Sequence, residues 1–166
     1  SSPLGLGKRM ETKTLKILVI EDNEADVLMV RDMLAQSRNE KFETVWASGM
    51  EKAKAVLSGN VFDAILFDLG LPDSTPEKTA ESIRSCVATT PVLIMTGRED
   101  DAFAVQMVQM GAQDYIPKNE LTAQWLLRAI RYAVERHQQK KQVEQLNEQL
   151  ERLSFLDPLT QLLNRR

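Results

Sequence analysis

The stretch Ala64–Asp68, AILFD, combines a run of four apolar residues with a carboxylate at its end. A short, continuous apolar run of this kind is typical of a strand that is covered on both faces. Two further runs, Ile17–Ile20 and Val92–Met95, also end in polar side chains. Such strands predict a parallel sheet, and the carboxyl ends of parallel strands meet at one edge, where ligands bind.

The rest of the chain alternates between short apolar runs and amphipathic stretches, which predicts five strand–helix repeats. The predicted strands are Leu15–Ile20, Phe42–Ala47, Phe62–Phe67, Pro91–Met95 and Asp114–Ile116. The predicted helices are Glu24–Ser37, Met50–Leu57, Pro76 to about Val87, Asp100–Met110 and a last one from about Thr122. Right-handed crossovers then favour an α/β fold, a flavodoxin-like doubly wound five-stranded parallel sheet with strand order 2-1-3-4-5 and an extended C-terminal helix.

Length and composition limit the classes of protein. The 166 residues suffice for one compact domain and an appendage, and a charged fraction of 27% is ordinary for a globular protein. A net charge of −3 gives no general attraction to nucleic acid. Cys86 is the single cysteine, which excludes an internal disulfide and a Cys-rich zinc site. No apolar run approaches the roughly 20 residues of a membrane-spanning helix, so we expect a cytoplasmic protein without membrane insertion.

The last predicted helix continues beyond the domain, because no proline or glycine occurs between Thr122 and Ser154. Its apolar residues Val143, Leu146, Leu150 and Leu153 are spaced three, four and three apart, as in a coiled-coil seam. We therefore predict a coiled-coil linker helix at 137–154 and a homodimer formed through it. A solvated helical extension is the alternative. At the other end, residues 1–9 are predicted to be left over from cloning, with Met10 as the native start.

Three acids, a hydroxyl and a lysine are expected at the same edge of the sheet: Glu21, Asp22, Asp68, Thr96 and Lys118. Two carboxylates about 4 Å apart repel by about 4 kcal/mol at an effective dielectric of about 20. Either one of them is protonated, or a cation lies among them. Hard oxygen ligands without histidine or cysteine suit Mg²⁺.

An aspartate beside such a metal can attack a phosphoryl group and form an acyl phosphate. Lys118 can add a second positive charge, and Thr96 can donate a hydrogen bond to a phosphoryl oxygen. Taken alone, Thr96 could be a strand-end cap and Lys118 a surface lysine. Their joint placement with Asp68 favours a phosphoryl site.

Four segments, in this order, resemble the receiver domain of two-component response regulators. They are Ile17–Asn23 (ILVIEDN), Ile65–Pro72 (ILFDLGLP), Val92–Gly97 (VLIMTG) and Gly111–Asn119 (GAQDYIPKN). The resemblance implies a receiver domain at 15–136 that accepts a phosphoryl group on Asp68 from a sensor histidine kinase or a phosphotransfer protein.

The resemblance also implies roles for the other residues. Asp22 and Asp68 would bind Mg²⁺ directly with the backbone carbonyl of Gly70, and Glu21 would bind it through water. Lys118 would pair with the phosphoryl group, and Thr96 with Tyr115 would form the switch. The chain departs from the usual pattern in two places: the first acid is glutamate, and residues 72–76 lack the usual glycine.

The end of the chain, Leu156–Arg166 (LDPLTQLLNRR), resembles the opening segment of GGDEF diguanylate cyclase domains, with Gln161 where glycine is usual. This implies that residues 155–166 are the stub of a GGDEF domain and that the longer protein makes cyclic di-GMP. The fragment itself would not be an enzyme. Phosphorylation would then change the dimer and so control the cyclase.

Two alternatives remain open at the level of sequence. A Mg²⁺-dependent aspartyl phosphohydrolase would use similar chemistry, but such enzymes usually place a second acid two residues after the nucleophile, where this chain has Gly70. A receiver-like scaffold that is never phosphorylated is the other.

Overall fold

The structure of the protein is a computed structural model that describes residues 13–71, 75–86, 89–97 and 101–156. The chain divides into two compact units, Ser1–Val134 and Glu135–Arg166. The first unit holds the sheet and its covering helices, and the second holds the greater part of the last helix.

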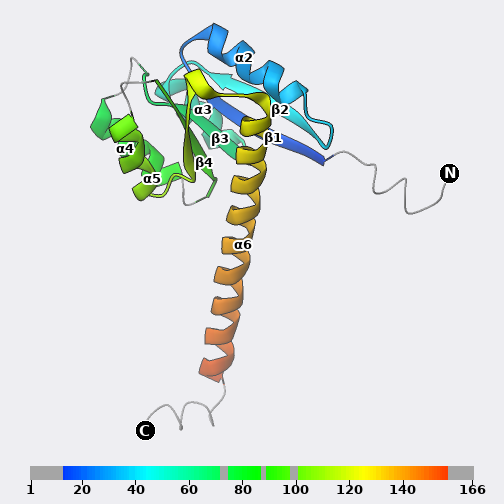
Figure 1. The fold of residues 1–166 in the computed structure, drawn as a ribbon. Helices are drawn as coiled ribbons and strands as arrows, with labels where there is room; N and C mark the ends of the chain where they lie inside the picture. Colours follow the sequence, from blue (N-terminus) through cyan, green and yellow to red (C-terminus); the bar gives the residue numbers. More distant parts are fainter. Residues whose placement is uncertain (1–12, 72–74, 87–88, 98–100, 157–166) are drawn as a thin grey trace, which may run out of the picture. The chain divides into compact units, whose positions relative to one another are not determined.

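Five parallel strands form the sheet in the order β2-β1-β3-β4-β5 (Figure 1). Their bounds are β1 Lys13–Ile20, β2 Glu40–Ala47, β3 Ala64–Asp68, β4 Val92–Thr96 and β5 Asp114–Pro117. The predicted fold class and strand order are therefore confirmed. The order changes direction between β1 and β3, which creates a switch point where ligands of such sheets bind.

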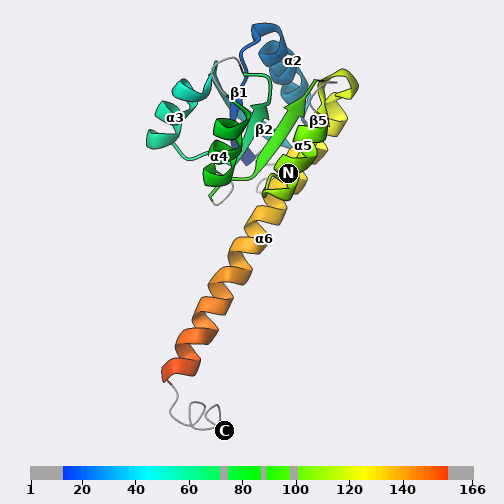
Figure 2. The same cartoon turned by 90° about the vertical axis from the view of Figure 1, so that its left-hand side faces the viewer.

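Helices follow the strands as predicted (Figure 2). Their bounds are α2 Glu24–Ala35, α3 Met50–Gly59, α4 Pro76–Cys86, α5 Asp101–Gln109 and α6 Ala123–Leu156, with a short 3-10 helix, η2, at Lys118–Glu120. Side chains cap two of the predicted starts: Thr75 Oγ1 accepts a hydrogen bond from Lys78 N at 3.3 Å, and Thr122 Oγ1 accepts one from Trp125 N at 3.1 Å.

The sequence misplaced the start of the central strand. Phe62–Phe67 was the predicted range, but β3 begins at Ala64. Phe62 is buried without belonging to the strand, and the side chain of Asp63 accepts a hydrogen bond from the backbone N–H of Lys16 at 2.8 Å. The Asp63 N–H donates to the Lys16 carbonyl at 2.8 Å, so the side chain replaces a backbone carbonyl only as the acceptor of the Lys16 N–H.

Alternate residues of each strand belong to two separate cores, one on each face of the sheet. Ile17, Leu66 and Leu93 pack in the core beneath α2 and the first turns of α6. Leu18, Ile65 and Ile94 pack in the core beneath α3, α4 and α5. This period of two explains why the strands are apolar throughout: both faces are covered.

Helix α2 shows where helical spacing alone misleads. Leu28 lies near helical spacing with Val27 and Val30 in the sequence, but its side chain is 52% exposed. The buried stripe consists of Val27, Val30 and Leu34, which recur every three to four residues. Leu28 is turned about 100° away from Val27 around the helix axis and faces away from the core.

An ion pair joins the edge strand β2 to α6. Arg131 donates from Nε to Glu40 Oε1 at 2.9 Å and from Nη2 to Glu40 Oε2 at 3.2 Å. Ser37 Oγ also donates to Glu40 Oε2, at 2.8 Å. The Arg131 guanidinium therefore lowers the pKa of Glu40, and Ser37 adds to the effect. This bidentate contact helps to fix the start of α6 against the sheet.

Candidate functional site

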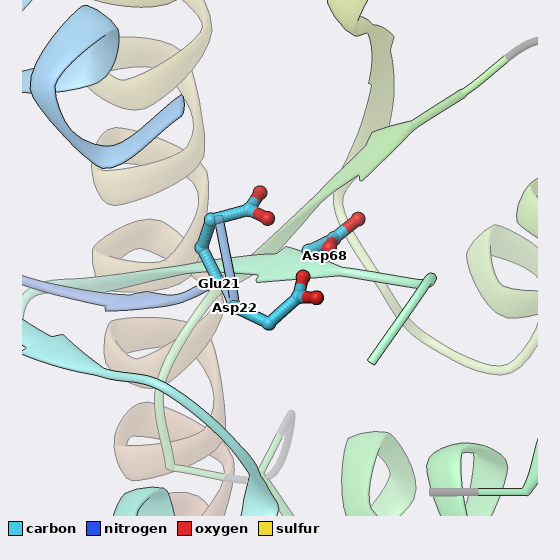
Figure 3. A group of neighbouring side chains, drawn as sticks. All are labelled: Glu21, Asp22 and Asp68. Carbon is cyan, nitrogen blue, oxygen red and sulfur yellow. The ribbon is translucent and has the colours of Figure 1, made fainter. Parts of the chain in front are cut away.

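The carboxyl ends of β1 and β3 bring three acids together. Glu21, Asp22 and Asp68 each offer a carboxylate oxygen, and the three oxygens all lie within 4.8 Å of one another. Figure 3 shows the side chains gathered where these two neighbouring strands end. The acids that the sequence predicted to meet are thus neighbours in space.

The three acids differ in their access to solvent. Glu21 is fully buried and Asp68 is 5% exposed, whereas Asp22 is exposed. A group that arrives from solution can therefore reach the cluster from the side of Asp22. Gly70 adjoins this cluster, since its backbone N–H donates to Asp68 Oδ1 at 3.2 Å.

Lys118, which directly follows β5, reaches across the sheet edge to the acids. Its Nζ lies 2.8 Å from Glu21 Oε2, 2.9 Å from Asp26 Oδ2 and 3.2 Å from Asp68 Oδ1. The contact with Glu21 is an ion pair without hydrogen-bond alignment, whereas the contact with Asp26 is a hydrogen bond. The predicted approach of Lys118 to Asp68 is therefore present in the structure.

Burial changes the protonation of this cluster. Desolvation raises the pKa of Glu21 to about 8, because burial and the neighbouring Asp68 outweigh the Lys118 ammonium. Burial also opposes the charge on Lys118, but the carboxylates of Glu21 and Asp26 outweigh it and raise the pKa of the ammonium. In the absence of another cation, Lys118 stays charged and Glu21 holds a proton near neutral pH.

Thr96 and Tyr115 lie on adjacent strands at the same edge. Thr96 pairs with Pro117 and Tyr115 pairs with Ile94, so Thr96 and Tyr115 share one face of the sheet, one diagonal step apart. Thr96 is fully buried, and its Oγ1 has no hydrogen-bond partner among the described residues. Tyr115 is half-buried and packs against the core beneath α3, α4 and α5.

The donor set fits Mg²⁺. The cluster supplies three carboxylates from Glu21, Asp22 and Asp68, and no imidazole or thiolate belongs to it within the described chain. Mg²⁺ prefers such oxygen ligands and keeps several waters, which the exposed side at Asp22 can admit. The segment 72–74, where the sequence departs from the receiver pattern, lies outside the described residues.

Sequence reasoning missed Asp26, which pairs with Lys118. Asp26 is the third residue of α2 after its N-cap Asn23, whose Oδ1 accepts a hydrogen bond from Ala25 N at 2.9 Å. Side chains of a helix lean towards its N-terminus, and the N-terminus of α2 starts beside the acid cluster. In the sequence, the signal that could have identified Asp26 was its position three residues after the N-cap Asn23.

Trp46, which belongs to β2, also contacts the site. Its indole Nε1 donates a hydrogen bond to the backbone carbonyl of Glu21 at 2.6 Å. The Glu21 N–H in turn donates to the Ala47 carbonyl at 3.0 Å. Strand β2 thereby fixes the backbone from which the buried acid projects.

We expect Trp46→Phe to lower the free energy of unfolding by about 1 kcal/mol, because the Glu21 carbonyl loses its indole donor. Urea unfolding followed by circular dichroism measures this difference. Trp125→Phe, which makes the same ring change on α6, is the control for ring size and is expected to cost less. Equal unfolding free energies for wild type and Trp46→Phe would contradict a stabilising role of this hydrogen bond.

Comparison with known proteins adds three findings on sequence. The profile of the family described as "Response regulator receiver domain" matches residues 17–131. The transcriptional regulatory protein BasR of Escherichia coli is 29% identical over 104 residues, which cover 63% of this chain and 46% of BasR. The virulence transcriptional regulatory protein PhoP of Salmonella typhimurium is 30% identical over 104 residues, with 63% and 45% covered. The chain thus spans less than half the length of these relatives.

A solved structure gives the same result for the fold. The response regulator receiver domain protein from Clostridium thermocellum is 26% identical and superimposes with a TM-score of 0.65. The match covers 75% of this chain and 97% of that protein. Along the part of the chain that the structure describes, no helix has the length and apolar character needed to cross a membrane.

Proposed function

Because this chain belongs to the response regulator receiver domain family, we propose that Asp68 is its phosphoryl acceptor and that a sensor histidine kinase or phosphotransfer protein supplies the group. One observation carries this assignment: the Asp68 carboxylate lies at the end of the central strand β3, 3.2 Å from Lys118 Nζ and within 4.8 Å of two other acids. The environment thus supplies a nucleophile and a cation at the same point.

In the proposed step, one Asp68 oxygen attacks the phosphorus atom of the donor and a new O–P bond forms. The bond between phosphorus and the donor breaks, and the donor leaves with the electron pair. Lys118 is placed to pair with the transferred oxygens, and Thr96 can donate its unpartnered hydroxyl to one of them. Tyr115 lies on the same face of the sheet as Thr96. We propose that its side chain moves when Thr96 turns towards the transferred group.

Mg²⁺ held by Glu21, Asp22, Asp68 and the backbone carbonyl of Gly70 would neutralise charge on the transferred group. This ligand set rests on the three converging carboxylates and on the position of Gly70 beside Asp68.

Acetyl phosphate tests the proposed function without a cognate kinase. After incubation with acetyl phosphate and Mg²⁺, the intact mass is expected to increase by one phosphoryl group, and EDTA is expected to suppress the increase. Formation of a beryllofluoride adduct without phosphoryl uptake would favour a slow receiver, whereas failure of both would favour the receiver-like scaffold. Turnover of phosphomonoesters that is lost in Asp68→Asn would favour the phosphohydrolase.

We propose further that the signal leaves through a dimer of α6, in a linker at 137–154 that leads to a GGDEF cyclase domain beginning at 155–166. Four apolar side chains support this proposal, because they lie at coiled-coil spacing in α6 and are 55–65% exposed in the single chain: Val143, Leu146, Leu150 and Leu153. A second copy would cover them. The new charge on Asp68 would change the geometry of that dimer and so the alignment of two cyclase domains.

Charges placed in the apolar stripe of α6 are expected to have a strong effect on dimerisation. Leu146→Lys with Leu150→Lys is expected to weaken dimerisation about a hundredfold or more, since each leucine loses roughly 1.5–3 kcal/mol of burial. Sedimentation equilibrium measures the dissociation constant. The control, Gln138→Lys with Gln145→Lys, adds the same charge on another face of α6 and should leave the dimer intact. A monomeric wild-type chain, or a dimer indifferent to the leucine changes, would reject this interface.

A further inference from the structure

Three carboxylates share the ammonium of Lys118, and one of them stands outside the acid cluster. Glu21 and Asp68 belong to the group whose oxygens lie within 4.8 Å of one another, but Asp26 does not. The ammonium of a lysine has three N–H groups and can therefore approach several acids at once. The Asp26 contact is 2.9 Å long and aligned as a hydrogen bond, whereas the Asp68 contact is the longest of the three at 3.2 Å.

Asp26 contacts Lys118 but lies outside the acid cluster. Asp26 projects from the first turn of α2, and Lys118 follows β5, so the two residues come from elements 92 residues apart in the chain. Both side chains are partly open to solvent, with 26% of Asp26 and 22% of Lys118 exposed. The pair can therefore form or separate without a change in the two cores.

Lys118 and a divalent cation compete for the same oxygens. An ammonium held close to Asp68 would neutralise the charge of that carboxylate and would repel a second cation at the acid cluster. An ammonium that gives one donor to Asp26 keeps a weaker hold on Asp68, whose contact is the longest at 3.2 Å, while its contact with Glu21 stays at 2.8 Å. Without Asp26, the acids left in contact with the Lys118 ammonium would be Glu21 and Asp68.

We propose that Asp26 is a positioning residue that draws Lys118 away from the Asp68 carboxylate and so keeps the acid cluster open to a divalent cation. This inference rests on the proposed metal site and adds to it a residue that does not touch the metal. Asp26 would act on metal affinity through the position of Lys118.

Titration calorimetry with MgCl₂ tests the first consequence. Asp26→Asn is expected to weaken Mg²⁺ binding about threefold to fivefold, which corresponds to somewhat under 1 kcal/mol for a partly exposed ion pair. Glu24→Gln is the matched control, because it removes one exposed acid from the same helical turn. Asp26→Glu should restore the affinity, and Asp26→Ser, a second neutral variant, should behave like Asp26→Asn.

Repeating the Asp26→Asn measurement without Lys118 distinguishes an effect through the position of Lys118 from an effect of the Asp26 charge on the metal. In a Lys118→Met background, Asp26→Asn should weaken Mg²⁺ binding no more than Glu24→Gln does. In EDTA, the urea midpoints of Asp26→Asn, Lys118→Met and the double variant should be non-additive, since the two residues share one contact.

Three outcomes would overturn the inference: equal effects of Asp26→Asn and Glu24→Gln on Mg²⁺ affinity, an Asp26→Asn effect that persists in Lys118→Met, or additive urea midpoints. A wild-type chain that binds no Mg²⁺ would reject the metal site together with this inference. If wild type and Asp26→Asn bind Mg²⁺ equally well, only the role of Asp26 is rejected and the metal site stands.

Discussion

Asp68→Asn is expected to abolish phosphoryl uptake from acetyl phosphate. The carboxylate oxygen that attacks phosphorus is replaced by a neutral amide, which is a far weaker nucleophile, while the shape of the side chain is kept. Intact mass spectrometry after incubation with acetyl phosphate and Mg²⁺ should show the phosphorylated species in wild type and none in the variant. The fold should survive, because the substitution keeps the shape of the side chain and removes one charge from a cluster of acids.

Asp114→Asn is the matched control for this experiment. Asp114 is exposed and begins β5, so it lies at the opposite edge of the sheet from the acid cluster. The same chemical change there should leave phosphoryl uptake at the wild-type level. Phosphorylation of Asp68→Asn at the wild-type rate would show that another residue is the acceptor.

The second large effect is a dependence of the folded chain's stability on pH, and it arises from Glu21. Burial raises the pKa of Glu21 to about 8 in the folded chain, above the value of 4.5 for an unburied glutamate. Between these values the folded state holds a proton that the unfolded state releases. The stability that this proton confers is present at low pH and is lost as the pH rises to about 8. At about 1.4 kcal/mol for each pH unit, the upper bound is about 5 kcal/mol.

Metal-free protein should therefore unfold at lower urea concentration at about pH 8 than at about pH 6. Glu21→Gln should flatten this dependence and should be more stable than wild type at the higher pH, because the glutamine needs no proton. Glu24→Gln, an exposed neighbour in sequence, should keep the wild-type dependence. Mg²⁺ should stabilise wild type more at the higher pH, where Glu21 is more readily ionised. A pH profile of Glu21→Gln that parallels wild type would refute this role of Glu21.

The sequence predicted the sheet and its order because apolar runs covered on both faces leave few topologies. The runs around Ile17, Leu66 and Ile94 are apolar at every position, which requires a helix layer on each side, and right-handed crossovers then limit the order of the strands. The meeting of Glu21, Asp22 and Asp68 follows from the same argument, since each acid stands at the carboxyl end of a strand.

What the sequence could not supply depends on three-dimensional neighbours. The pairing of Asp26 with Lys118 joins positions 92 residues apart and depends on the direction of a side chain in the first turn of α2. The hydrogen bond from Trp46 depends on the register between β1 and β2. The exposure of Leu28 depends on which face of α2 meets the sheet, and the late start of β3 depends on the Asp63 side chain.

Helix α6 has a consequence for the engineering of chimaeric proteins. Its early residues Leu126, Ile130, Ala133 and Val134 are part of the core beneath one face of the sheet, and the same unbroken helix continues to Leu156. A junction placed before Val134 would remove core residues and not merely a connector. Fusion junctions should therefore lie beyond Val134, with insertions in multiples of seven residues to keep the apolar stripe in phase.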